Sequence, residues 1–172
     1  MMHLTNSLSV VEFPEIAGDT PLPTKQARRA TRLAQCRVIR SSGCHRYGYW
    51  NEQFLFDGRT DTGWCTPSRK NRQREFLEID LATEKAITKM RLLSRSINKN
   101  AGLPEHITIL VPDAVGWKSV IALKVGEQDL SSWYEWPLPH ISGPTIRLEF
   151  DGVGIRPEGK YFLQFMALEF YA

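Results

Sequence analysis

Short segments in which apolar and polar residues alternate follow one another from Cys36 to the end of the chain. In REFLEIDLA and in PTIRLEF, aliphatic or aromatic residues fill every second position, and charged or polar residues fall between them. Successive side chains of a strand point to opposite faces, so this period predicts half-buried strands. Gly, Pro, Asn and Asp punctuate the segments as turn formers. Eight strands are expected, at residues 36–41, 74–82, 86–95, 105–112, 117–125, 131–138, 144–150 and 161–172.

This pattern predicts an all-β fold, a sandwich or a barrel of about eight antiparallel strands, over residues 35–172. Residues 1–34 are expected to form a basic N-terminal extension. The segment KQARRATRLAQ within and just beyond it favours a short helix by propensity. The inner rows of a sandwich are buried and its end loops are free, so function is expected in the loops.

The composition of the 172 residues is that of an ordinary globular domain with a core. No apolar run approaches the roughly 20 residues that span a bilayer, and the start lacks the pattern of a signal peptide. A cytoplasmic location is therefore favoured. The three cysteines are expected to be free thiols, because an odd count without a secretion signal argues against a disulfide framework. Zinc is not expected, since the spacing of structural zinc ligands is absent.

The net charge is +3, and basic residues gather in two runs. Seven lie between Pro21 and Asn51 without any acid, and the second run is Arg69, Lys70, Arg72 and Arg74. Such runs can bind phosphates, but they are more often a solvated face. Nucleic acid is therefore not favoured as a partner; steep salt dependence of binding would be its signature.

The stretch FDGRTDTGW (residues 56–64) is rich in Asp, Gly and Thr and ends on a tryptophan. These residues favour a tight turn with many oxygens, held by one large ring. Three interpretations are open: a structural turn, a site for a hard cation, and the rim of a binding pocket.

The order of motifs from residue 36 to the end resembles a discoidin domain, also called the coagulation factor V/VIII type C domain. Each motif is short, and their order makes the resemblance specific. It rests on Ser41-Ser42, on D-G-x-x-x-T-x-W (Asp57, Gly58, Thr62, Trp64), on EFLEIDLATEKAITKMRLLSR, on HITILVPDAVGWKSV with Asp113 and Trp117, and on YFLQFMALEFYA with Glu169 before an aromatic residue. The resemblance implies a jelly-roll β-sandwich and a binding module rather than an enzyme. No GxSxG, HExxH, phosphate-binding glycine loop or Rossmann fingerprint supports catalysis.

The resemblance also implies a structural calcium ion near the D-G-x-x-x-T-x-W turn. Its ligands would be oxygens of Asp57, Thr62 and Glu169, which suit a hard cation. Arg59 and Ala167 replace residues that are often acidic or Asn in calcium-binding members. The alternative is a metal-free turn in which Asp57 caps backbone amides.

In sugar-binding relatives an Arg ends the strand after the isoleucine-threonine element, and an Asn follows a few residues later. Arg95, Asn98 and Asn100 are placed similarly here, whereas Cys65 stands where some relatives have His. Planar hydrogen-bonding groups and an aromatic face are what a neutral sugar needs. The loop HRYGYWN completes the candidate site with His45, Arg46, Tyr47, Tyr49 and Trp50.

Two functions are carried forward. The first is a non-catalytic carbohydrate-binding module that holds a glycan or glycoprotein in its end loops. The second is an intracellular protein-interaction or scaffold module on the same fold. Trp117 is expected in the core, as the resemblance implies. In an extended WYEWP segment Trp133 shares a face with Glu135, which would leave it partly in solvent; core packing is the favoured alternative for both Trp133 and Trp136.

Overall fold

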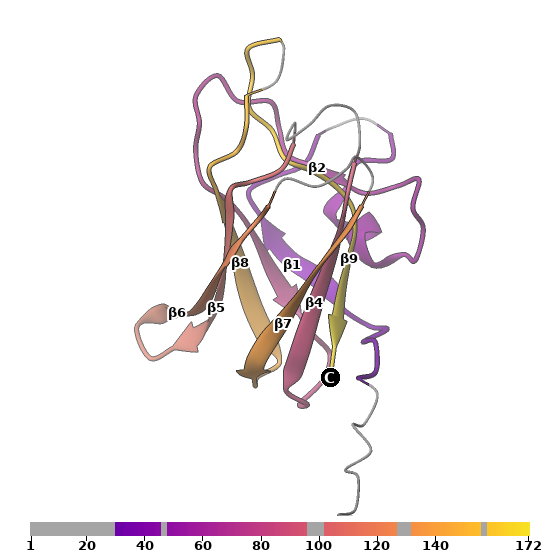
Figure 1. Ribbon diagram of the computed structural model, residues 1–172, viewed down its shortest axis with the longest axis vertical. Coiled ribbons are helices and arrows are strands. Elements are labelled where there is room, and N and C mark those ends of the chain that lie inside the picture. The colour runs from indigo at the N-terminus through magenta and orange to yellow at the C-terminus, as the bar shows by residue number, and fades with distance from the viewer. Residues whose placement is uncertain (1–29, 46–47, 96–101, 127–131, 156–157) are drawn as a thin grey trace, which may run out of the picture.

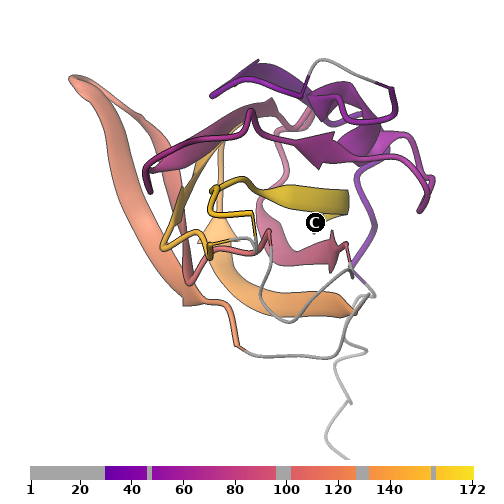
Figure 2. The same ribbon diagram turned by 90° about the horizontal axis from the view of Figure 1, so that it is seen from above.

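The computed structural model describes residues 30–45, 48–95, 102–126, 132–155 and 158–172. Two antiparallel sheets form a sandwich in this part of the chain (Figure 1). The five-stranded sheet has the order β1 (Arg37–Ser41), β3 (Glu75–Asp80), β8 (Thr145–Asp151), β5 (His106–Asp113) and β6 (Gly116–Lys124). The four-stranded sheet has the order β2 (Trp64–Cys65), β9 (Gln164–Tyr171), β4 (Ile87–Ser94) and β7 (Trp133–Ile141). Seen along the strands, the larger sheet curves around the smaller one (Figure 2).

The all-β sandwich and all eight expected strands are confirmed. The two-residue strand β2 and the 3-10 helix η1 (Glu52–Phe56) were not expected, because neither is long enough to show a period. The helix expected around residues 25–35 is not formed by its described part. Residues 31–33 pair with the end of β9 instead, where Thr31 N–H donates to the Ala172 carbonyl at 2.8 Å. Local helix propensity is weak, so the backbone hydrogen bonds that this segment gains along the edge of β9 outweigh it.

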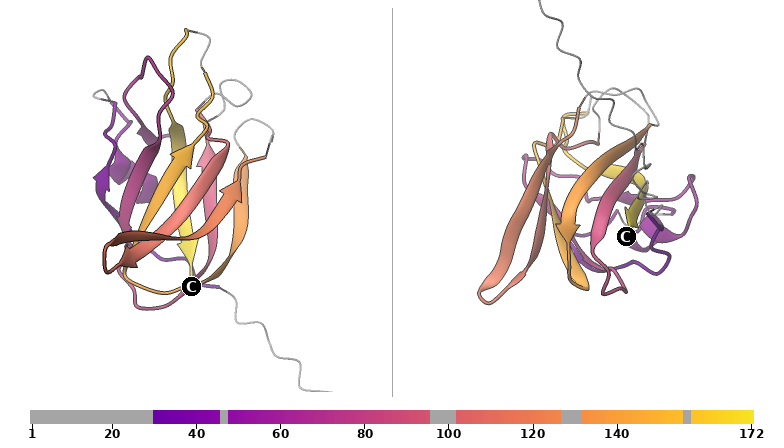
Figure 3. Two further views of the ribbon diagram at one scale, coloured as in Figure 1. Left: turned by 90° about the vertical axis from the view of Figure 1, so that its left-hand side faces the viewer. Right: turned by 60° about the horizontal axis from the view of Figure 1, so that its bottom comes forward.

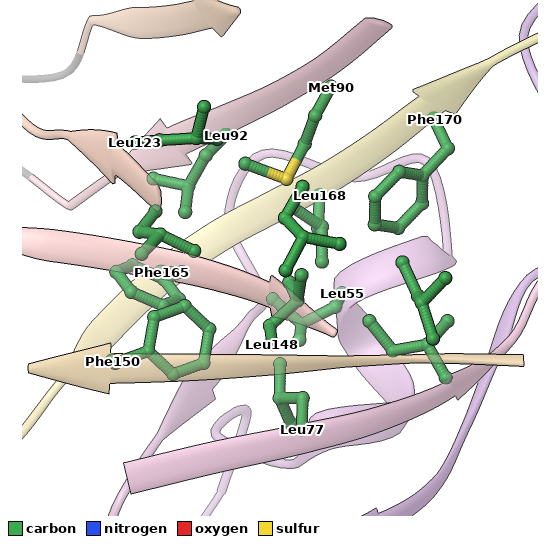
Figure 4. Close-up of a cluster of buried hydrophobic side chains, with 14 of the residues drawn as sticks. Leu55, Leu77, Met90, Leu92, Leu123, Leu148, Phe150, Phe165, Leu168 and Phe170 are labelled. Carbon is green, nitrogen blue, oxygen red and sulfur yellow. The ribbon is translucent and has the colours of Figure 1, made fainter. Parts of the chain in front are cut away.

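The core lies between the sheets and gathers aliphatic and aromatic side chains from both (Figure 4). Phe150, Phe165 and Trp64 meet there, with ring centres 5.3–5.9 Å apart. Burying a large apolar side chain contributes about 1.5–3 kcal/mol, so the core carries the stability of the domain. The loops are thereby left free to serve binding.

The last strand departs from its expected spacing. Phe162, Met166, Leu168 and Phe170 fall at even positions, yet the core takes Phe165 rather than Met166. The register of β9 against β4 shifts between Leu93 and Ser94, and this irregularity skips Met166. A bulge moves later side chains to the opposite face, which a strict period of two cannot anticipate.

The ends of the strands that carry the candidate site meet at one end of the sandwich. Ser94, the last residue of β4, pairs with Phe165 at the start of β9, and His106 at the start of β5 pairs with Lys124 at the end of β6. Most of the long connections gather at this loop end (Figure 3). The β5–β6 hairpin turns at the opposite end.

Candidate functional site

The D-G-x-x-x-T-x-W stretch forms a closed turn on the carboxylate of Asp57. One carboxylate oxygen accepts the N–H of Arg59 at 2.8 Å, and the other accepts the hydroxyl of Thr62 at 2.7 Å. Gly58 has a φ of +80°, a conformation that glycine adopts at little cost. Thr62 is buried although Asp57 is exposed. The turn thus closes through the capping geometry that the metal-free interpretation expects.

Trp64 anchors this turn in the core. Its side chain is fully buried between Phe150 and Phe165, and its indole N–H donates to the Gly43 carbonyl at 3.0 Å. A buried indole N–H needs such a partner. The expectation that the ring holds the turn is therefore confirmed, and the same hydrogen bond ties the turn to the loop after β1.

Gly63 lets the turn approach β9 closely. A Cβ atom at this position would lie 2.0 Å from the carbonyl oxygen of Phe165, so no side chain fits. The Gly63 N–H donates to the Tyr49 carbonyl at 3.0 Å, and Gly63 forms a parallel bridge with Trp50. The turn therefore sets the backbone position of the two aromatic residues at the loop end.

Arg95 meets Trp50 across the loop end. The guanidinium carbon lies 4.5 Å from the centre of the Trp50 ring, within the range of a cation–π contact. Tyr49, the preceding residue, has 67% of its surface exposed. The loop end thus carries a flat cation with several N–H donors, stacked on Trp50, and an exposed aromatic residue next to Trp50 in the sequence. A planar donor and an aromatic face are two of the groups that bind a neutral sugar.

Of the other candidate residues of this site, the structure describes one and leaves the rest outside the described residues. His45 is exposed, and its N–H donates to the Cys65 carbonyl at 2.7 Å, so it borders the same loop. Arg46, Tyr47, Asn98 and Asn100 lie outside the described residues, and their assignment stays a prediction. Sequence reasoning missed the stacking of Arg95 on Trp50, because no local pattern links residues 45 positions apart.

Glu169, the third expected calcium ligand, is held by other groups. Its carboxylate pairs with Arg91 at 3.1 Å and Arg32 at 3.2 Å, and accepts the Tyr171 hydroxyl at 2.7 Å. Among the described residues no cluster of three or more His, Cys, Asp or Glu side chains could hold a metal ion. A cation at Glu169 would have to displace two guanidinium groups, so this donor set fits calcium poorly, and calcium stays a prediction.

The three cysteines form no disulfide within the described residues and remain thiols, as expected. Cys36 and Cys65 are buried, and Cys44 is half-buried. Burial raises the pKa of the Cys36 thiol to about 11, with the nearby Asp80 carboxylate adding to the effect. Burial also raises the pKa of Cys44, assisted by a hydrogen bond with Glu52. Thiols held neutral in this way are poor nucleophiles.

The three arginines of the second basic run are paired with acidic side chains. Its arginines pair within 3.5 Å as follows: Arg69 with Glu75, Arg72 with Glu105, and Arg74 with Glu149 and Asp151. Phosphate binding needs cations that are not already paired. The arrangement therefore agrees with the interpretation as a solvated face and does not favour nucleic acid.

Three further tryptophans, on strands β7 and β6, test the expectations for this part of the chain. Trp133 is half-buried under the guanidinium of Arg91, 4.3 Å from its ring centre, and Arg91 also pairs with Glu135. This confirms the shared face of Trp133 and Glu135, whereas the favoured core packing of Trp133 is wrong, because its side chain is only half-buried. Trp136 packs against the core as a partly buried side chain. Trp117 does not join the core as expected. It is half-buried on strand β6, 5.9 Å from the guanidinium of Arg147.

The sequence model of the F5/8 type C domain matches residues 38–161. The chain therefore belongs to this family, as the order of its motifs predicted. No curated protein matches the sequence. Within the part of the chain that the structure describes, no helix is long and apolar enough to cross a membrane.

Solved structures share the fold at low sequence identity. The module CpGH89CBM32-5 from Clostridium perfringens, in complex with GalNAc-β-1,3-galactose, has a TM-score of 0.66 and 19% identity over 83% of this chain and 100% of that one. The family 32 module of NanJ from C. perfringens, in complex with galactose, has a TM-score of 0.63 and 15% identity over 83% and 99%. Chitosan-binding module 1 of a Paenibacillus chitosanase/glucanase has a TM-score of 0.56 and 17% identity over 83% and 99%. At these identities the likeness establishes the fold alone.

Proposed function

We propose that this protein is a non-catalytic carbohydrate-binding module that holds a glycan at the loop end of the sandwich. The observation that carries the proposal is the placement of the Arg95 guanidinium on Trp50, whose neighbour in the sequence, Tyr49, is exposed. The two solved modules from Clostridium perfringens, which were crystallised with sugars, support the class of ligand.

Each group has a distinct role in this proposal. Arg95 donates N–H groups in a fixed plane to a pair of sugar hydroxyls, and Trp50 holds that plane by stacking. Tyr49 offers an open aromatic face to the apolar side of the sugar ring. The Asp57–Thr62 turn and Gly63 fix the backbone that carries Tyr49 and Trp50. None of these roles requires a covalent step.

A glycan array compares the wild type with Arg95→Ala. We expect specific binding by the wild type and its loss in Arg95→Ala. Arg37→Ala is the matched control, because Arg37 is an exposed arginine that pairs with Asp80 on β3, away from the loop end. Equal thermal midpoints for all three proteins show that the fold is kept.

A blank array for the wild type would overturn the proposal and direct the search to protein partners by pull-down, in line with the scaffold interpretation. Retained binding in Arg95→Ala would overturn the assignment of this site. Equal losses in Arg95→Ala and Arg37→Ala would mean that net charge, not the geometry of Arg95, governs the signal.

A further inference from the structure

A hollow lies at the loop end, at the ends of three strands of the five-stranded sheet. It has a volume of about 540 Å³, within the roughly 300–1,000 Å³ of sites that hold small molecules. It lies where β5 begins and where β6 and β8 end, whereas Arg95 follows β4 of the other sheet. Its lining residues are Leu103, Pro104, Glu105, Lys124, Val125, Gly126, Gly152 and Gly154.

Backbone hydrogen bonds fix the walls of this hollow. Val125 N–H donates to the Glu105 carbonyl and Glu105 N–H to the Asp151 carbonyl, both at 2.9 Å. Gly154 N–H donates to the Leu103 carbonyl at 3.3 Å. Three segments that are distant in the sequence are thus tied together around the space. A hollow with preformed walls loses little ordering entropy when a ligand enters.

Glycine keeps the space open. Gly152 has a φ of +71°, and a Cβ atom there would lie 2.6 Å from the Cβ of Glu105, so a side chain would push Glu105 away. Gly126 is different, because a Cβ atom added there meets nothing within 4 Å. A side chain at Gly152 would therefore strain the backbone and collide with Glu105, whereas a side chain at Gly126 would enter open space.

The chemistry of the lining suits a polyhydroxylated ligand. Glu105 brings a carboxylate, which pairs with Arg72 at 3.5 Å with both side chains more than half exposed. Arg72 in turn lies 5.9 Å from the ring of Tyr161. Lys124 is an exposed residue of the lining and takes part in none of the ion pairs that the described residues form. An acceptor and several donors stand beside apolar Leu103, Pro104 and Val125.

We infer that this hollow is a second saccharide subsite, which receives a further unit of the glycan held at Arg95 and Trp50. The inference rests on the proposed function. Sugar hydroxyls both donate and accept, so they can use Glu105 and Lys124 together, while the ring carbons contact the apolar wall. A purely apolar ligand is disfavoured, because it would cover Lys124 without giving its charge a partner.

Glycans of increasing length test the inference. The strongest array hit of at least four sugar units is titrated by calorimetry together with its mono- and disaccharide fragments. The proteins are the wild type, Lys124→Ala, Glu105→Gln and Gly126→Leu. Lys118→Ala is the matched control, because Lys118 is also an exposed lysine on β6 but lies toward the hairpin at the opposite end. Thermal unfolding verifies that each variant is folded.

We expect each polar variant to bind the longest glycan about threefold to tenfold more weakly, which is the loss of one net hydrogen bond. Gly126→Leu fills open space and should weaken the same glycan, while the shortest fragment that still binds keeps its affinity. Lys118→Ala should match the wild type for every length.

Unchanged affinity of the three variants for the longest glycan overturns the subsite, even if Arg95→Ala abolishes binding and the proposed function stands. Equal weakening for the short and long glycans also overturns it, since the hollow would then act on the first site. A wild type that binds no glycan of any length overturns the proposed function and the subsite with it.

Discussion

The guanidinium carbon of Arg95 lies 4.5 Å from the centre of the Trp50 ring. One face of Trp50 is therefore covered by an arginine, and the side chain of the preceding residue, Tyr49, is 67% exposed. Trp50 in turn pairs with Gly63, which follows the turn closed by Asp57 and Thr62. The family's signature turn is thus linked to the candidate ligand site through the backbone.

Trp50 should contribute to glycan affinity indirectly, by holding the guanidinium of Arg95 in place. Trp50→Ala removes the stacked ring, and we expect glycan affinity to fall about twofold to fivefold, which corresponds to a cation–π contact at an exposed site. Trp50→Phe keeps a ring and should retain most of the affinity. Isothermal titration of both variants with the array hit measures this. Weaker binding by Trp50→Phe than by Trp50→Ala would contradict a stacking role.

Tyr49 should contact the sugar directly. Tyr49→Ala is expected to weaken glycan binding by about 1 kcal/mol, or roughly fivefold, and Tyr49→Phe to keep the ring contact. Because the side chain is 67% exposed, the thermal midpoint should not change. Titration and thermal unfolding separate the two effects. Full affinity in Tyr49→Ala would remove Tyr49 from the site.

Gly63 should tolerate no side chain. Gly63→Ala places a Cβ atom 2.0 Å from the Phe165 carbonyl oxygen, against the backbone of a central strand. We expect the free energy of unfolding to fall by about 1–3 kcal/mol or more, as for other overpacked sites. Urea denaturation provides the measurement. Gly126→Ala, where the new Cβ meets open space, should stay within about 0.5 kcal/mol of the wild type and serves as the control.

The variant Asp57→Asn distinguishes a turn that binds calcium from a turn that is closed by hydrogen bonds alone. With chelator present, Asp57→Asn should cost about 1 kcal/mol, because the carboxylate accepts both the Arg59 N–H and the Thr62 hydroxyl. The calcium prediction expects added calcium to raise the thermal midpoint of the wild type but not that of Asp57→Asn, since a ligand of the folded state stabilises it. A wild-type midpoint that calcium and chelator leave unchanged refutes that prediction.

The buried thiol of Cys36 should make the free energy of unfolding decrease as the pH rises above about 9. Burial raises the pKa of its thiol from 9.0 to about 11. Above the lower value the unfolded chain releases a proton that the folded protein keeps, so the contribution of Cys36 to stability is complete below pH 9 and is lost between pH 9 and about 11. Urea denaturation from about pH 8 to pH 10 should show a steeper fall for the wild type than for Cys36→Ala. Parallel profiles would contradict the prediction.

The sequence by itself determined the strands, the sandwich and the turn. Alternation in segments such as REFLEIDLA reports which face of a strand is buried, and this is a property of neighbouring residues. The spacing of Asp57 and Thr62 likewise lies within one turn, so their hydrogen bond follows from local geometry. The family order of motifs added that Trp64 anchors this turn, and its full burial bears that out.

Only the tertiary structure decided what depends on contacts between distant segments. The skipped Met166 comes from a register shift between β4 and β9, and the two arginines on Glu169 come from other parts of the chain. The hollow beside Lys124 exists because the ends of three strands are tied by backbone hydrogen bonds. A period along the chain records which side of an element is buried, but not what the other elements bring to it, so these features appear only when the sheets are packed.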